Sequence, residues 1–120
     1  KLDYIVNWIP ARLAGLLTVL CAFLVGLDGK NAWKIYRRDC HNHASPNSAQ
    51  TESACAGALQ VQLAGDAYYF GKLCHKPTIG DPIRPVKPQD IVLANRLMVA
   101  SDLVFAALCC AAWAMVYWLI

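Results

Sequence analysis

The chain has 120 residues, of which 58% are hydrophobic, and its formal net charge is +3. A mean hydropathy of +0.36 is too high for an ordinary soluble domain, and the apolar residues gather toward the two ends of the chain. The modest positive charge lies between these ends and suits anionic head groups or anionic metabolites better than nucleic acid. The composition therefore indicates a protein embedded in a lipid bilayer, with no nucleic-acid partner.

The first apolar segment, residues 5–27, is expected to form a membrane helix or a re-entrant helix. Leu13 to Leu27 alone covers only about 22 Å at helical rise, so the segment spans a bilayer only if the residues before it also enter. Trp8 would anchor the helix at the interface, and Pro10 would lie in its first turn, where its missing N–H costs little. The chain starts without Met and without the layout of a signal peptide, so we expect the C-terminal portion of a longer protein.

A polar stretch, residues 28–96, is expected to form a long loop that contains short helices. Residues 31–39 have the pattern of an amphipathic helix that could lie on the membrane surface. Ser45 and Pro46 are typical of a helix start, and the small residues that follow allow close helix packing. Residues 59–63 alternate with a period of two, so this segment is either a strand or the end of that helix.

The C-terminal part of the chain gives the clearest pattern. Between residues 75 and 88, four prolines and Gly80 exclude regular helix and favour an ordered extended loop. The last helix is expected to start near Gln89 or Asp90, where a carboxylate complements the helix dipole. Residues 97–120 form an apolar run of 24 residues, which at roughly 36 Å is long enough to cross a membrane. Aromatic residues toward its far end would form an interfacial belt: Trp113, Tyr117 and Trp118.

Charge placement predicts the orientation. Nine of the eleven Lys and Arg residues lie between Asp28 and Arg96, so the positive-inside rule places residues 28–96 in the cytoplasm. Asp102 interrupts the apolar run and should face protein or water, as a partner in helix packing. The six cysteines are expected to be reduced thiols, because three lie in apolar segments and the polar stretch faces the cytosol. The predicted fold is mostly α, part of an integral, multi-helix, multi-pass protein of the inner (plasma) membrane.

The candidate catalytic residues follow the amphipathic segment. A helix that opens at Ser45 would present free N–H groups to a phosphate or carboxylate, yet a simple helix cap explains this serine equally well. Arg38 and His43 could add positive charge beside it. Glu52 could bind Mg²⁺, act as a base for an attacking amine, or be a solvated helix carboxylate. Arg12 could bind a substrate phosphate or reach the head groups, but a spanning first helix would place it across the membrane from Ser45.

Several short motifs, in order over nearly the whole chain, resemble the CobD/CbiB family. They are Asn7-Trp8-Ile9-Pro10-Ala11-Arg12-Leu13, Ser45-Pro46-Asn47, Ala56-Gly57-Ala58-Leu59-x-Val61-x-Leu63-x-Gly65, Tyr69-Phe70-Gly71, and Pro77-Thr78-Ile79-Gly80 with Asp90-Ile91. Separate motifs that agree in order and spacing make a specific signal.

That family is the integral-membrane adenosylcobinamide-phosphate synthase of cobalamin biosynthesis. The resemblance implies a ligase that forms an amide between adenosylcobyric acid, a corrinoid, and aminopropanol or its phosphate, with ATP and Mg²⁺ as co-substrate. It favours Ser45, Asn47 and Glu52 as catalytic residues. It implies substrate binding, including contact with the flat corrin ring, by Arg12, Arg38, His43, Tyr69, Gly71 and Gly80. The sequence has no Gly-x-x-x-x-Gly-Lys loop, so ATP binding follows from the resemblance or lies elsewhere in the longer protein.

Two other functions stay open on the residues alone. A tetrahedral zinc site could in principle use Cys40, His41, His43, Cys74 and His75, although their spacing matches no common zinc finger. The other alternative is a non-catalytic or degenerate membrane scaffold, because residues 49–51 depart from the Gly-Trp-Pro that usually follows this motif in the family. The residues predict no oligomeric state.

Overall fold

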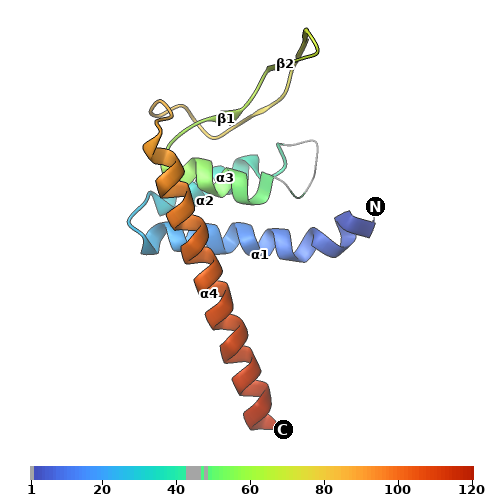
Figure 1. Cartoon of the computed structure of the whole chain (residues 1–120), viewed down its shortest axis with the longest axis vertical. Helices are drawn as coiled ribbons and strands as arrows, with labels where there is room; N and C mark the ends of the chain where they lie inside the picture. Colours follow the sequence, from blue (N-terminus) through green and yellow to red (C-terminus); the bar gives the residue numbers. More distant parts are fainter. Residues whose placement is uncertain (1, 43–46, 48) are drawn as a thin grey trace.

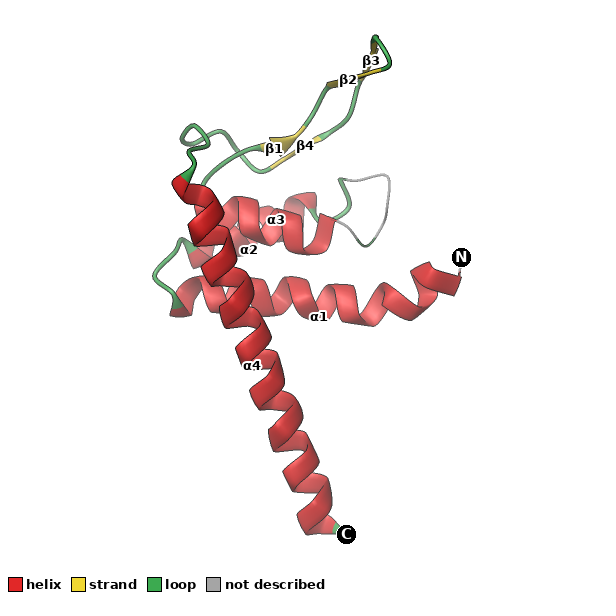
Figure 2. Cartoon of the chain, viewed as in Figure 1, coloured by secondary structure: helices red, strands yellow, loops and turns green. Residues whose placement is uncertain are grey.

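The computed structural model describes residues 2–42, 47 and 49–120, and within them the chain is mostly helical (Figures 1 and 2). The helices are α1 (Leu2–Leu24), α2 (Gly29–Asp39), α3 (Ala49–Leu59) and α4 (Gln89–Leu119). Two short antiparallel pairs of strands lie between α3 and α4. β1 (Leu63–Ala64) pairs with β4 (Thr78–Ile79), and β2 (Ala67–Tyr69) pairs with β3 (Lys72–Cys74). The predicted mostly helical fold is confirmed.

Small residues bring α1, α2 and α3 close together. A Cβ added at Gly57 of α3 would lie only 2.6 Å from the carbonyl oxygen of Asn31 in α2. A Cβ added at Gly15 of α1 would lie 2.5 Å from the ring of Tyr36. Alanines and a few larger apolar residues fill the core between the four helices: Val19, Cys21, Ala22, Ala32, Tyr36, Ala54, Ala58 and Leu97. The close packing predicted from the small residues of α3 is therefore confirmed.

The helix boundaries confirm some predictions and correct others. The amphipathic segment is helical as α2, and α4 starts at Gln89 as expected. α3 begins at Ala49, later than predicted, and the proposed cap at Ser45 lies outside the described residues. The alternating segment after α3 is mostly neither helix nor strand, because Gln60 has a φ of 61° that ends the helix, and strand pairing begins only at Leu63.

Pro10 does not lie in a first turn, because α1 already begins at Leu2 and the proline is inside it. A proline ring removes one backbone donor from a helix interior. On the adjacent turn the guanidinium of Arg12 donates to the carbonyl oxygen of Trp8 at 3.1 Å. The apolar residues on both sides of the proline continue the helix pattern, which explains why the helix extends past it.

In the described part of the chain, two helices are long and apolar enough to cross a membrane, by length and composition: Ile5–Leu24 within α1 and Gln89–Leu119, which is α4. α4 crosses α1, and its C-terminal half then projects alone, away from the rest of the chain (Figure 1). Trp113 and Trp118 in this half are 72% and 85% exposed. The hairpin of β2 and β3 lies at the opposite end of the molecule (Figure 1).

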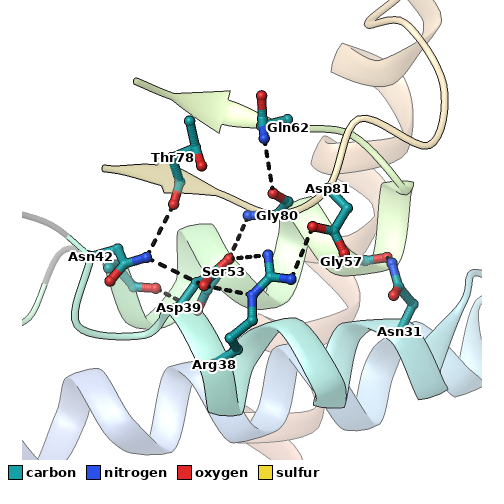
Figure 3. A network of polar contacts seen from close by, with 11 residues as sticks. Asn31, Arg38, Asp39, Asn42, Ser53, Gly57, Gln62, Thr78, Gly80 and Asp81 are labelled. Atoms are coloured by element: carbon teal, nitrogen blue, oxygen red, sulfur yellow. Dashed lines mark hydrogen bonds and ion pairs between the residues drawn. The ribbon is translucent and has the colours of Figure 1, made fainter. Parts of the chain in front are cut away.

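A buried carboxylate connects segments that are far apart in the sequence (Figure 3). Asp39, at the end of α2, is 3% exposed. Its two oxygens accept hydrogen bonds from Arg38 Nε and Nη2, both at 2.8 Å, and from the Gly80 N–H at 2.7 Å. Asn42 Nδ2 also donates to it at 3.3 Å and to the Thr78 carbonyl oxygen at 3.1 Å. The Asp39 carboxylate therefore fixes β4 against the ends of α2 and α3.

The protonation of Asp39 is set by these contacts. Burial raises the pKa of Asp39, but the hydrogen bonds from Arg38 and the Gly80 N–H more than offset it, so that the pKa lies below its ordinary value of 3.8. Because the pKa of Asp39 is lower in the folded state than in the unfolded state, its carboxylate stabilises the fold at any pH above the unfolded-state pKa. This stabilisation is lost as the pH falls through the folded-state pKa.

We expect Asp39→Asn to lower the melting temperature of the purified protein near neutral pH, because it removes a charged acceptor from Arg38 and Gly80. The free energy of unfolding should fall by roughly 2 to 4 kcal/mol, as for lost hydrogen bonds to buried charges. The measurement is thermal unfolding from pH 7 down to pH 2.5. The difference between variant and wild type should shrink as the pH falls from about 4, the pKa of the unfolded-state carboxyl, toward the lowered pKa of the folded state. A difference that stays constant with pH would contradict this role.

Gly80→Ala is expected to destabilise the fold more than Gly71→Ala does. Both glycines have a left-handed φ, 86° and 79°, so both substitutions carry a similar backbone cost of about 1 to 2 kcal/mol. Only at Gly80 would the new Cβ collide with the Val61 carbonyl oxygen, whereas nothing lies within 4 Å of a Cβ at Gly71. Unfolding midpoints of the two variants test this, and equal losses would show that crowding at Gly80 is unimportant.

Candidate functional site

A cavity of about 640 Å³ lies where α1, α3 and α4 meet, next to the crossing of α1 and α4. Its walls are mostly apolar side chains of α1 and α4, such as Leu17 and Phe105. The polar side chains in the lining come from all three helices: Thr18, Thr51, Glu52, Asn95, Ser101 and Asp102. A largely apolar cavity with a few polar groups is the usual form of a small-molecule site.

Glu52 and Asp102 are the two charged residues in the lining of this cavity, and both are acidic. Glu52 lies in the first turn of α3, where a carboxylate is favoured by the helix dipole. The nearby hydroxyls are engaged by helix carbonyl oxygens: Thr18 donates to Ala14 at 2.7 Å, and Ser101 donates to Leu97 at 2.8 Å. These two carboxylates give the otherwise apolar lining an acidic character, which suits a small cationic group such as an ammonium.

A basic group lies close to this acidic cavity. Two nearby residues of α1, Pro10 and Leu13, line the cavity, although Arg12 itself does not. The guanidinium of Arg12 lies 3.9 Å from the centroid of the Trp8 ring, and its Nη1 lies 3.4 Å from Asn47 Oδ1. An arginine and an amide in contact could together hold an anionic oxygen, such as that of a phosphate or carboxylate.

The contact between Arg12 and Asn47 bears on where Arg12 lies relative to the polar stretch. A spanning first helix was expected to separate Arg12 from the polar stretch. In the structure that stretch folds back onto α1 through α2 and α3, and it brings Asn47 within hydrogen-bond distance of Arg12. The predicted residues Arg12, Asn47 and Glu52 therefore lie at one end of the same helix assembly.

Other predicted site residues lie elsewhere or outside the described part of the chain. Arg38 and Gly80 belong to the network around Asp39, and Arg38 Nη1 also pairs with Asp81 at 2.9 Å. Tyr69 and Gly71 lie at the tip of the β2–β3 hairpin, which Figure 1 shows far from the crossing of α1 and α4. Their roles in substrate binding stay predictions. Ser45 and His43 lie outside the described residues.

Sequence reasoning missed two features. Asp102 was expected to face protein or water as a partner in helix packing; it does face the cavity, but no role in a site was predicted for it, although the signal was a lone carboxylate in an apolar run. Gln50 was not predicted at all. It is buried, accepts a hydrogen bond from Tyr36 Oη at 2.8 Å and donates to the Cys40 carbonyl oxygen at 3.1 Å. Burial raises the pKa of Tyr36, so this hydroxyl is a hydrogen-bond donor at neutral pH.

The alternative zinc site gains no support from the geometry. Among residues 2–42, 47 and 49–120, no group of three or more His, Cys, Asp or Glu side chains is placed to hold a metal ion. His75 instead pairs with Asp66, with 3.2 Å between Nδ1 and Oδ2. The six cysteines are free thiols, as expected.

The comparisons with known proteins agree with one another. The family model described as CobD/Cbib protein matches residues 1–98. A cobalamin biosynthesis protein CobD of Clostridium perfringens is 50% identical over 98 residues, which is 82% of this chain and 31% of that protein. A CobD of Geobacter metallireducens is 52% identical over 83% of this chain and 31% of that protein, and the cobalamin biosynthesis protein CbiB of Salmonella typhimurium is 46% identical over 90% and 34%.

No solved structure matches the chain. The chain spans about a third of the length of these curated relatives. The motifs quoted above, the family model and the relatives all lead to the same conclusion: this chain belongs to the CobD/CbiB family.

Proposed function

We propose that the protein containing this chain forms an amide bond between a carboxylate of adenosylcobyric acid and the amine of aminopropanol or its phosphate, in cobalamin biosynthesis. Membership of the CobD/CbiB family and the names of the relatives support the pathway. The observation that carries the reaction class is the placement of Glu52 and Asp102 in one apolar cavity next to the pair formed by Arg12 and Asn47. An acidic pocket suits the amine, and the basic group suits the carboxylate or phosphate.

The residues have distinct roles in this proposal. When bound, ATP with its Mg²⁺ would supply a phosphoryl group to the corrinoid carboxylate, and Glu52 or Asn47 would offer an oxygen ligand of the kind that Mg²⁺ prefers. Asp102 binds the ammonium form of the amine in the cavity. The bound ammonium first loses one proton to water, and the free amine attacks the carbonyl carbon of the acyl phosphate. Glu52 takes the second proton from the nitrogen as the C–N bond forms and the C–O bond to phosphate breaks, which releases inorganic phosphate. Arg12 and Asn47 hold the anionic oxygens of the substrate in place for the attack.

The same proposal includes the membrane. Residues 97–120 of α4 would span the inner membrane, because this stretch is long and apolar, and its C-terminal part projects alone and exposes aromatic side chains. Residues 28–96 would lie in the cytoplasm, in agreement with their positive charge. α1 would lie at the membrane boundary as a re-entrant or interfacial helix, because Arg12 contacts the cytoplasmic Asn47.

Glu52→Gln is expected to reduce amide formation by roughly 100-fold or more, because glutamine keeps the size of the side chain but cannot accept the proton. The assay is conversion of adenosylcobyric acid in membranes that contain the full-length protein, ATP and aminopropanol phosphate. Thr51→Ala, at the neighbouring position in the same cavity, is the matched control and should retain most of the activity. Normal turnover by Glu52→Gln, at equal protein level, would exclude Glu52 as the base.

Asp102→Asn is expected to raise the KM for the amine by roughly tenfold, since a charge-assisted hydrogen bond to the ammonium is lost. The KM for ATP should stay the same, because Asp102 is assigned only to the amine. Ser101→Ala is the control in the same cavity, as its hydroxyl is already engaged by the Leu97 carbonyl oxygen. Equal increases in the KM for the amine and the KM for ATP would show that Asp102 stabilises the structure of the site and does not bind the amine specifically.

A further inference from the structure

A second hollow lies on the other side of α1, between α1 and α2. This groove of about 360 Å³ is lined by Leu16, Val19, Leu20 and Phe23 of α1 and by Lys30 and Trp33 of α2. Leu20 and Phe23 are 49% and 53% exposed, so their apolar surfaces are available to a ligand. None of these six residues belongs to the acidic cavity described above.

The outer face of α2 is basic and aromatic. Its inner face is buried against α1 and α3 through Ala32, Ile35 and Tyr36. The opposite face exposes Lys30, Trp33, Lys34 and Arg37, and the guanidinium of Arg37 lies 5.6 Å from the centroid of the Trp33 ring. No acidic residue lines the groove, and the described ion pairs of the chain involve none of these three cations.

We propose that this groove binds one anionic phospholipid. The acyl chain would lie along the apolar wall of α1, and the phosphate would contact Lys30, Lys34 and Arg37 on α2. The positions of the apolar and basic parts fit a phospholipid. The apolar wall belongs to α1, which lies on the same side of α2 and α3 as the projecting C-terminal half of α4 (Figure 1). Trp33 lies between the two parts, where tryptophan prefers the interface.

Charge complementarity decides in favour of an anionic over a zwitterionic lipid. A lysine or arginine close to an anionic bilayer surface strengthens association by roughly fivefold for each charge. A bound lipid at this position would also hold α1 at the level of the head groups, which is where the proposed function places this helix.

The test uses the full-length protein in nanodiscs that contain brominated phosphatidylglycerol or brominated phosphatidylcholine. Bromine quenches tryptophan fluorescence at contact, and subtraction of a Trp33→Phe variant isolates the signal of Trp33. We expect stronger quenching with brominated phosphatidylglycerol than with the choline lipid, each at the same low mole fraction. The preference should fall roughly fivefold for each charge removed in Lys30→Gln/Lys34→Gln.

Lys72→Gln/Lys87→Gln removes the same charge from exposed positions outside the groove and should keep the preference. Equal quenching by the two lipids would overturn the proposal. So would the absence of quenching by either lipid, which would show that another part of the full-length protein covers the groove. Protection of Trp33 by millimolar glycerol 1-phosphate would also overturn it, because the site would then bind soluble phosphates. None of these readouts depends on amide formation, so the lipid site and the proposed reaction can fail separately.

Discussion

The buried carboxylate of Asp39 is the interaction on which the rest of the structure depends. It joins the end of α2 to Gly80, and the Thr78 carbonyl oxygen is held through Asn42. This link presses β4 onto α3, where Ile79 is fully buried against alanines of α3. An apolar residue alone could not hold an extended, proline-rich segment in register, because that segment has few backbone partners of its own. The Asp39 carboxylate, which accepts hydrogen bonds from four donors, holds the segment in register at one point.

The position of α4 follows from this link. The segment after Gly80 leads to Arg84, whose guanidinium pairs with Asp90 in the first turn of α4. Asp90 also accepts the N–H of Lys87 at 2.7 Å, so it closes the start of the helix in the manner of a cap. The pairing with Arg84 lowers the pKa of Asp90, which keeps it charged at neutral pH. The start of α4 is thus fixed by ionic contacts, and the direction of the helix decides which residues reach the cavity.

The chain separates opposite charges over a small distance. The cavity on one side of α1 carries two carboxylates, while the groove on the other side is bordered by lysine and tryptophan. Both the carboxylates of the cavity and the lysine of the groove lie against apolar walls. The low dielectric there strengthens their electrostatic interaction with a bound charge. The same helix can therefore serve the proposed binding of an amine and of an anionic lipid, because its two faces meet different neighbours.

The sequence by itself determined the class of this protein, its helices and its family. The apolar runs, the amphipathic α2 and the start of α4 near Gln89 follow from local patterns of side chains, which need no knowledge of distant contacts. The family motifs likewise pointed to Asn47 and Glu52. Local patterns failed at Pro10, because a single proline does not end a helix whose apolar face continues on both sides.

Only the tertiary structure decided how these elements meet. No pattern in the sequence shows that Asp39 bonds to Gly80, or that Asp102 and Glu52 share a cavity, since these pairs are far apart along the chain. The contact of Arg12 with Asn47 overrides the separation that a spanning first helix would impose. Such contacts depend on the close packing of whole helices and on the satisfaction of buried charges, and both are properties of the folded assembly.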